Sequence, residues 1–142
     1  MKRKRWMALL IWLIMTCYLC IQAGEKSKML SGFLAQGLYP IILSLSSIIS
    51  YESAHYFIRK IAHFVMHFVL GTLIYRALET VDRDKIIILV KSLTTAILIA
   101  VSNELIQNVA ISRGPMPSDA FINIAGVIFG THICYILHAL KE

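Results

Sequence analysis

Long apolar runs separated by short polar connectors constrain the fold of this chain more than any other feature. The runs cover about residues 6–23, 57–78, 86–110 and 118–140, and each has the roughly 17 to 25 residues that a helix needs to cross a bilayer. With 15% charged residues and a mean hydropathy of +0.71, the chain has too little charge for the surface of a soluble domain. We therefore predict an all-α membrane protein, a bundle of four transmembrane helices that forms a single domain over residues 1–142.

The first apolar run leaves a choice between a retained span and a cleaved signal peptide. Four cations, Lys2–Arg5, stand directly before it, as they do in a cytoplasmic anchor. A cleavage site needs small residues, and the bulky Ile21 stands two positions before Ala23. The apolar run is also long for a signal peptide, so a retained span is favoured.

Residues 24–59 form a mixed stretch that is polar at first and then apolar and rich in serine over residues 37–50. Pro40 interrupts the apolar part and leaves it too short to span a bilayer. We expect an extracytoplasmic segment that is interfacial or re-entrant, with a further crossing left open.

The distribution of Lys and Arg predicts a multi-pass protein of the cell membrane with both termini in the cytoplasm. The amino end has four such residues, and Arg76, Arg83, Lys85 and Lys91 lie around the connector after the second span, whereas Arg113 stands alone after the third. Four further cations in the mixed stretch weaken this pattern. The net charge of +6 forms no continuous basic face, so no nucleic-acid partner is expected.

Strongly polar residues inside the predicted spans lie within about two turns of the outer boundary. An ionisable group in a bilayer costs at least a few kcal/mol, so these residues are candidates for function. Helix depth at roughly 1.5 Å per residue places them in one layer, where we expect His63, Glu104, Arg113 and Asp119 to converge within about 8 Å. The candidate catalytic, acid–base or orienting groups are His63, Glu104 and Asp119, and the candidate ligand-binding groups are Arg59, Lys60, Gln107, Arg113 and Asn123.

The same residues also have an ordinary structural interpretation. Histidines such as His63 and His67 often form hydrogen bonds between helices, and a buried Glu104 needs a cationic partner in any case. Gly126 and Gly130 are interpreted as a face of close helix packing. No compact ligand motif predicts a metal, no cofactor is expected, and the sequence decides neither the oligomeric state nor whether a reaction is catalysed.

Three blocks of sequence are similar to those of a known family. Residues 22–27 read Gln-Ala-Gly-Glu-Lys-Ser, residues 59–64 read Arg-Lys-Ile-Ala-His-Phe, and residues 102–107 read Ser-Asn-Glu-Leu-Ile-Gln, followed by Arg113-Gly114, Asp119, Asn123 and Gly126. In these blocks the chain resembles the VanZ-like family of bacterial membrane proteins, which is named for a teicoplanin-resistance protein. It departs from the family at Asn103, where an acid is usual, and at Met66-His67, where many members have Glu-Tyr.

The resemblance implies a four-span protein of the bacterial cell envelope, in some members linked to resistance against glycopeptides such as teicoplanin. It implies no settled biochemical activity. Our first hypothesis is that the chain binds or modifies an anionic envelope component, a membrane lipid or glycopolymer, at the outer leaflet. The alternative is a non-catalytic accessory protein whose polar layer only stabilises the bundle. A small transporter is disfavoured because the cytoplasmic halves of the spans offer no polar path and no internal repeat is visible.

The predicted topology is testable by labelling single cysteines placed at Ser27, Asp84 or Ser112, with the three native cysteines replaced. A thiol reagent that cannot cross the membrane should label the first and third positions in intact cells, and the second only after the cells are opened. Strong labelling at position 84 in intact cells would overturn the topology.

Overall fold

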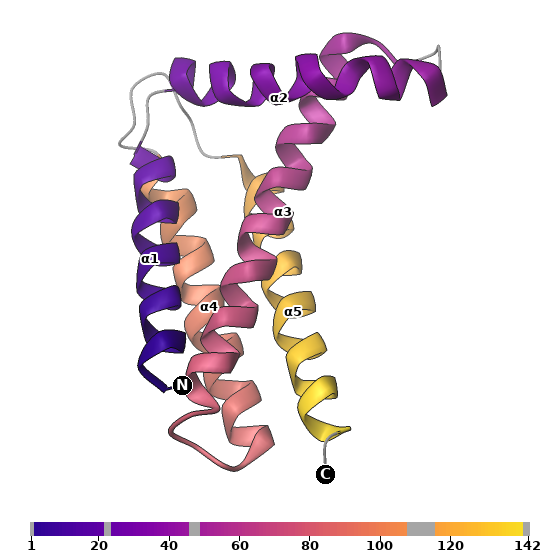
Figure 1. The fold of residues 1–142 in the computed structure, drawn as a ribbon. Helices are drawn as coiled ribbons and strands as arrows, with labels where there is room; N and C mark the ends of the chain where they lie inside the picture. The colour runs from indigo at the N-terminus through magenta and orange to yellow at the C-terminus, as the bar shows by residue number, and fades with distance from the viewer. Residues whose placement is uncertain (1, 22–23, 46–48, 108–115, 141–142) are drawn as a thin grey trace.

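Helices make up most of the part of the chain that the structure, a computed structural model, describes: residues 2–21, 24–45, 49–107 and 116–140. Four of the five helices found there run alongside one another and the fifth lies across one end of them (Figure 1). The helices are α1 (Lys2–Ile21), α2 (Gly24–Leu45), α3 (Tyr51–Leu78), α4 (Lys85–Gln107) and α5 (Pro117–Ala139).

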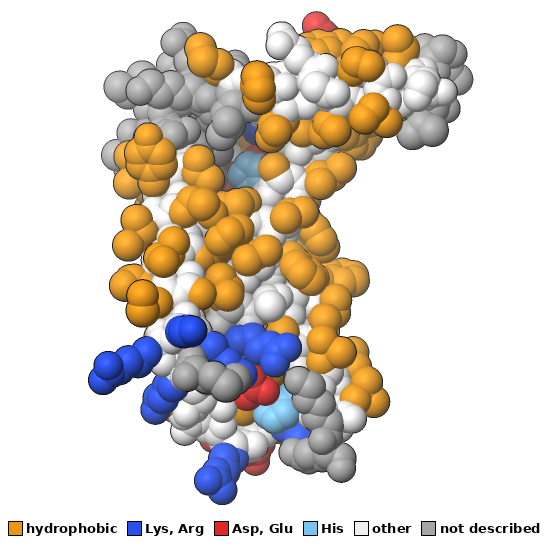
Figure 2. Space-filling model, viewed as in Figure 1, with side chains coloured by type: hydrophobic (Ala, Val, Ile, Leu, Met, Phe, Trp, Pro, Cys, Tyr) orange, Lys and Arg blue, Asp and Glu red, His pale blue; other side chains and the backbone are white. Residues whose placement is uncertain are grey.

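The prediction of an all-α bundle with four membrane-spanning helices is confirmed. By length and composition, α1, α3, α4 and α5 are each able to cross a membrane. We call the end of the bundle that carries α2 the α2 end, and the opposite end, where α3 connects to α4, the connector end. Both chain termini lie towards the connector end (Figure 1). Lys and Arg side chains also gather there, beyond a broad band of apolar side chains (Figure 2).

The α2 helix corrects one expectation and settles another. It continues through Pro40, which was expected to interrupt the segment. A proline inside a helix leaves the carbonyl four residues earlier without its donor, and here that residue is Gln36, which is exposed. The helix lies across the bundle and does not run along it (Figure 1), and it exposes large apolar side chains such as Met29 and Phe33. This is the arrangement of an interfacial helix, not of a further crossing.

Contacts between α2 and the start of α3 hold the crosswise helix in place. The α3 helix begins at Tyr51, earlier than the predicted span, because the Ser50 side chain caps it by accepting the Ser53 N–H at 3.3 Å. The Ser31 hydroxyl is 2.8 Å from Nε2 of His55, and the Tyr51 hydroxyl donates to a backbone carbonyl of α2 at 3.3 Å. The extra turns of α3 therefore form the support on which α2 rests.

The α3 and α5 helices form the most extensive contact of the bundle, and glycines make their close approach possible. A Cβ atom built on Gly126 or Gly130 would overlap the backbone carbonyl oxygen of Phe64 or Phe68 on α3. A Cβ on Gly71 would lie 2.6 Å from the carbonyl oxygen of Val127. The prediction that Gly126 and Gly130 face another helix is confirmed, since small residues let two membrane helices approach closely.

An ion cluster around Glu79 joins three helices at the connector end. Arg5 of α1 approaches the Glu79 carboxylate at 2.5 Å, Arg76 of α3 at 3.5 Å, and Nδ1 of His138 on α5 at 3.7 Å. The Tyr75 hydroxyl lies 3.1 Å from the same histidine nitrogen. The sequence analysis did not anticipate this cluster, which fastens α1 to the rest of the bundle.

Replacing Gly130 by Ala should destabilise the protein by about 1 to 3 kcal/mol, because the added methyl group forces α3 and α5 apart. Unfolding of the purified protein in detergent measures the effect. The matched control is Gly37→Ala, where a Cβ meets nothing within 4 Å and helix propensity predicts no loss of stability. Equal stability of the two variants would show that the α3–α5 contact is loose.

Candidate functional site

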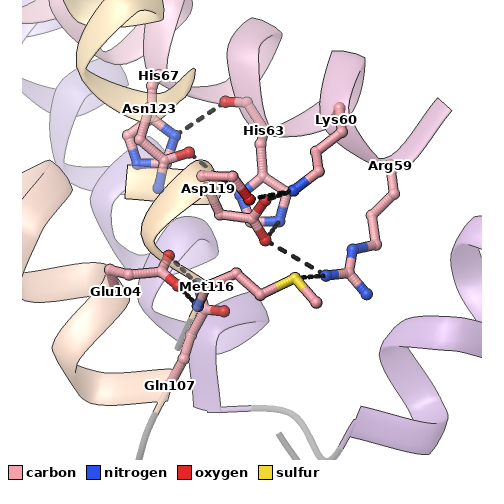
Figure 3. Close-up of polar contacts among 10 residues, drawn as sticks. Arg59, Lys60, His63, His67, Glu104, Gln107, Met116, Asp119 and Asn123 are labelled. Atoms are coloured by element: carbon pink, nitrogen blue, oxygen red, sulfur yellow. Dashed lines mark hydrogen bonds and ion pairs between the residues drawn. The ribbon is translucent and has the colours of Figure 1, made fainter. Parts of the chain in front are cut away.

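The buried carboxylate of Asp119 is the centre of the polar residues at the α2 end (Figure 3). Asp119 is 1% exposed. Its Oδ1 accepts a hydrogen bond from Nζ of Lys60, and its Oδ2 lies 3.3 Å from Nη2 of Arg59 and 3.8 Å from Nε2 of His63. All three partners come from one stretch of α3, so we refer to these four residues as the Asp119 cluster.

The local sequence explains how the Asp119 cluster forms. Lys60 and His63 are three residues apart and share one face of α3, and Asp119 lies in the first turn of α5 after Pro117. The amino end of a helix favours negative charge because its backbone N–H groups are unsatisfied. Lys60 Nζ also donates to the Ser118 hydroxyl at 2.9 Å, so one lysine holds two consecutive residues of α5 against α3.

His63 is held between α3 and α5 by polar contacts on both sides of its ring. Its Nδ1 lies 3.1 Å from Oδ1 of Asn123, one turn further along α5 than Asp119, and its Nε2 points towards the carboxylate. An amide oxygen can only accept a hydrogen bond, so Nδ1 carries a proton. The ring is half-buried, and it is oriented in the way that an acid–base group requires.

Glu104 of α4 forms a second, separate polar contact with the start of α5. Its Oε1 accepts the backbone N–H of Met116 at 2.8 Å, and its Oε2 accepts from the Gln107 amide at 3.3 Å. Met116 also places its sulfur 3.3 Å from Nη2 of Arg59. Met116 therefore stands between Glu104 and the Asp119 cluster (Figure 3), a link that a methionine in a turn does not reveal in the sequence.

A cavity of about 130 Å³ lies beside the Asp119 cluster, between α1, α2, α3 and α4. Arg59, His63 and Gln107 line it, together with His67 and Asn103. In Figure 2 a histidine lies at the bottom of an opening beneath α2. The predicted polar residues thus border a space that a ligand is able to enter.

The eight predicted site residues separate into two groups and one residue that is not described. Arg59, Lys60, His63, Asp119 and Asn123 are linked through the Asp119 cluster, and Glu104 with Gln107 forms the second contact. Arg113 lies outside the described residues, so its predicted approach to the others stays a prediction, as do the roles of all eight. His67 and Asn103 were seen as polar residues of the spans but were not among the site candidates.

A metal centre is not among the features of this layer in the described ranges, where no three His, Cys, Asp or Glu side chains gather closely enough to hold an ion. What the layer offers is charged and hydrogen-bonding side chains beside a cavity.

Four membrane-spanning helices with a buried ion cluster between α3 and α5 define the chain as a small multi-pass membrane protein. The sequence model of one protein family, described as VanZ/LLP1, matches residues 5–138, and the chain belongs to this family. The resemblance seen in the sequence blocks is thereby confirmed. No curated protein and no solved structure matches the chain.

Replacing Asp119 by Asn should lower the free energy of unfolding by about 3 to 5 kcal/mol, because Lys60 is then buried without a counter-charge. Unfolding in increasing dodecyl sulfate measures this. Replacing both partners, as in Lys60→Met with Asp119→Leu, should recover part of the loss because it removes the unpaired buried charge.

The control for this prediction is Asp82→Asn at the connector end. Asp82 accepts a hydrogen bond from Lys91 at 2.7 Å, and that bond lowers the pKa of its carboxyl. The pair is open to solvent, where ion pairs contribute little, so the unfolding midpoint should hardly change. Equal effects at positions 82 and 119 would contradict a buried Asp119 cluster.

Proposed function

We propose that this protein binds an anionic component of the cell envelope at the outer leaflet and that the Asp119 cluster supplies the binding charge. The observation that supports this most is the convergence of two permanent cations, Arg59 and Lys60, on a single carboxylate beside a cavity. One positive charge of the cluster exceeds what Asp119 neutralises. An anionic group next to the cluster would balance it.

Arg59 is the cation best suited to meet the ligand. Its side chain is 27% exposed, against 9% for Lys60, and a guanidinium presents a planar fork that pairs with two oxygens of a phosphate or carboxylate. Lys60 is instead occupied by Asp119 and Ser118. In this proposal Lys60 positions α5, and Arg59 contacts the anion.

The proposal places the α2 end at the outer leaflet of the cell membrane and both termini in the cytoplasm. Support comes from the position of Lys2–Arg5, Arg83 and Lys85 at the opposite end of the bundle, since cations favour the cytoplasmic side. The apolar side chains of α2 then rest in the outer interface. An envelope lipid or glycopolymer reaches the cavity from that side.

Chemistry at the bound ligand is a further part of the proposal. His63 would transfer a proton, with Asp119 stabilising its charged form and Asn123 fixing the ring. Glu104 would act by holding Met116 and the start of α5 in place, since both its oxygens already accept hydrogen bonds.

A second candidate function, a structural accessory protein, is favoured by the charge balance of the layer. Among its described residues, two cations, Arg59 and Lys60, face two carboxylates. A neutral network of this kind is able to hold helices together without any ligand. The two candidates differ in whether charge removal changes binding while the fold is retained.

Binding is tested with the purified protein by native mass spectrometry, with phosphatidylmethanol as the anionic probe and phosphatidylcholine of the same chains as the neutral one. The wild type should prefer the anionic lipid about tenfold, and Arg59→Gln should remove most of this preference, because a hydrogen bond to a charged group contributes that much. Arg83→Gln removes the same charge from an exposed position at the connector end and should leave the preference unchanged.

The link to glycopeptide resistance is tested in cells by measuring teicoplanin susceptibility together with membrane abundance. Arg59→Lys is informative because it keeps the charge and removes only the planar fork. If Arg59→Gln, Arg113→Lys and Asp119→Asn keep full function at normal abundance, the polar layer is scaffolding and the proposal fails.

A further inference from the structure

Three polar atoms on residues that line the cavity have no hydrogen-bond partner in the described structure, although all three are buried. They are Nε of Arg59, Nδ2 of Asn103 and Nε2 of His67. Asn103 is 2% and His67 4% exposed. Buried polar groups are nearly always hydrogen-bonded in native proteins, so three unpaired atoms around one cavity indicate groups that a bound molecule satisfies.

Two of the three atoms are donors. The Arg59 Nε–H and the Asn103 amide N–H groups have no acceptor function, so they require oxygen atoms on the ligand. Arg59 reaches Asp119 and Met116 only through Nη2, which leaves the Nε–H edge of the guanidinium for another partner. A negatively charged oxygen suits this position best.

The third atom, Nε2 of His67, is an acceptor. Nδ1 of His67 lies 2.9 Å from the backbone carbonyl oxygen of His63, and a carbonyl accepts only, so Nδ1 carries the proton. In the neutral ring Nε2 then has a lone pair and no hydrogen. Charging this ring would add a second N–H with no acceptor at a buried position, which is unfavourable. The ligand must therefore also provide a donor, and a hydroxyl group is the simplest one.

The dimensions and walls of the cavity restrict the ligand further. About 130 Å³ equals the space of about four water molecules at roughly 30 Å³ each, which admits a small headgroup but not a lipid chain. Leu19, Leu34 and Ile58 make part of the wall, and α2 exposes apolar side chains beyond it. A chain attached to the headgroup would lie on this apolar surface at the membrane boundary.

We infer that the cavity binds the headgroup of an anionic lipid that carries a free hydroxyl, of the phosphoglycerol type. The phosphate oxygens accept from Arg59 Nε–H and Asn103 Nδ2–H, and the hydroxyl donates to His67 Nε2. This inference rests on the proposed anion-binding function and adds the requirement for a hydroxyl, with His67 as the residue that reads it.

Four probes separate the contributions in native mass spectrometry of the purified full chain. Phosphatidylglycerol has charge, hydroxyl and chains; phosphatidylmethanol lacks the hydroxyl; phosphatidylcholine lacks the net charge; and soluble glycerol phosphate lacks the chains. Phosphatidylglycerol should bind about tenfold more tightly than phosphatidylmethanol, as one buried hydrogen bond predicts. Glycerol phosphate should compete weakly, because the apolar surface beside the cavity contributes nothing to its binding.

The residue-level test uses two histidines with the same backbone hydrogen bond. His67→Phe should abolish the preference for phosphatidylglycerol over phosphatidylmethanol and keep the preference of phosphatidylmethanol over phosphatidylcholine. His132, whose Nδ1 lies 2.9 Å from the Ile128 carbonyl oxygen at an exposed position of α5, is the matched control, and His132→Phe should change neither ratio. His67→Gln retains an acceptor and should recover part of the hydroxyl preference. Asn103→Leu should weaken both anionic lipids about tenfold.

The outcomes distinguish this inference from the function on which it rests. Equal binding of phosphatidylglycerol and phosphatidylmethanol, both above phosphatidylcholine, would overturn the hydroxyl requirement and leave anion binding standing. Equal binding of all three lipids would overturn both. Glycerol phosphate binding as tightly as phosphatidylglycerol would show that the ligand is a soluble phosphate ester and not a lipid. The wild-type comparison needs no variant, so the inference stays open to refutation even if His67→Phe fails to fold.

Discussion

The structure depends on the burial of one carboxylate, that of Asp119, in a bundle whose surroundings are apolar. A charge that is removed from water has a large desolvation cost, and only close partners offset it. Lys60 provides the nearest partner and Arg59 the second. Because both cations come from consecutive positions of α3, the charge requirement fixes the rotation of α3 relative to the start of α5.

The same requirement depends on close packing further along the two helices. Gly126 and Gly130 bring the backbone of α5 against that of α3, and only at this separation does a short aspartate side chain reach the lysine ammonium. The charge pair and the glycine face therefore support each other. Neither the ion cluster nor the cavity beside it would keep its shape if α3 and α5 moved apart.

The sequence predicted the parts of this arrangement that follow from helix periodicity and depth. Apolar run length located the four spans, and residue depth placed Asp119 and Lys60 in one layer. It did not predict which carboxylate the cations would meet, because depth alone does not fix the rotation of each helix. Glu104 was expected to need a cationic partner, yet its described hydrogen bonds come from the Met116 N–H and the Gln107 amide.

The other differences from expectation have local causes. Pro40 was taken to end the segment after the first span, but α2 runs along the outside of the bundle, where the unpaired carbonyl is free to meet polar surroundings. The early start of α3 follows from a serine cap at Ser50, a signal that is weak when several serines stand nearby. The partnerless atoms of His67 and Asn103 arise only from the packing of four helices, which no single segment specifies.

The distribution of polar groups along the bundle also bears on the kind of function that is possible. The Asp119 cluster lies at the α2 end and the Glu79 cluster at the connector end, and fully buried apolar side chains such as Leu70, Ala96 and Val127 lie in the core between them. A transported ion or polar molecule needs a continuous polar path or a site near the middle of the membrane. In the described helices the polar cavity is instead confined to one end, where it adjoins the interfacial α2. That geometry favours a molecule that enters and leaves from one side, as an envelope lipid does, over one that crosses.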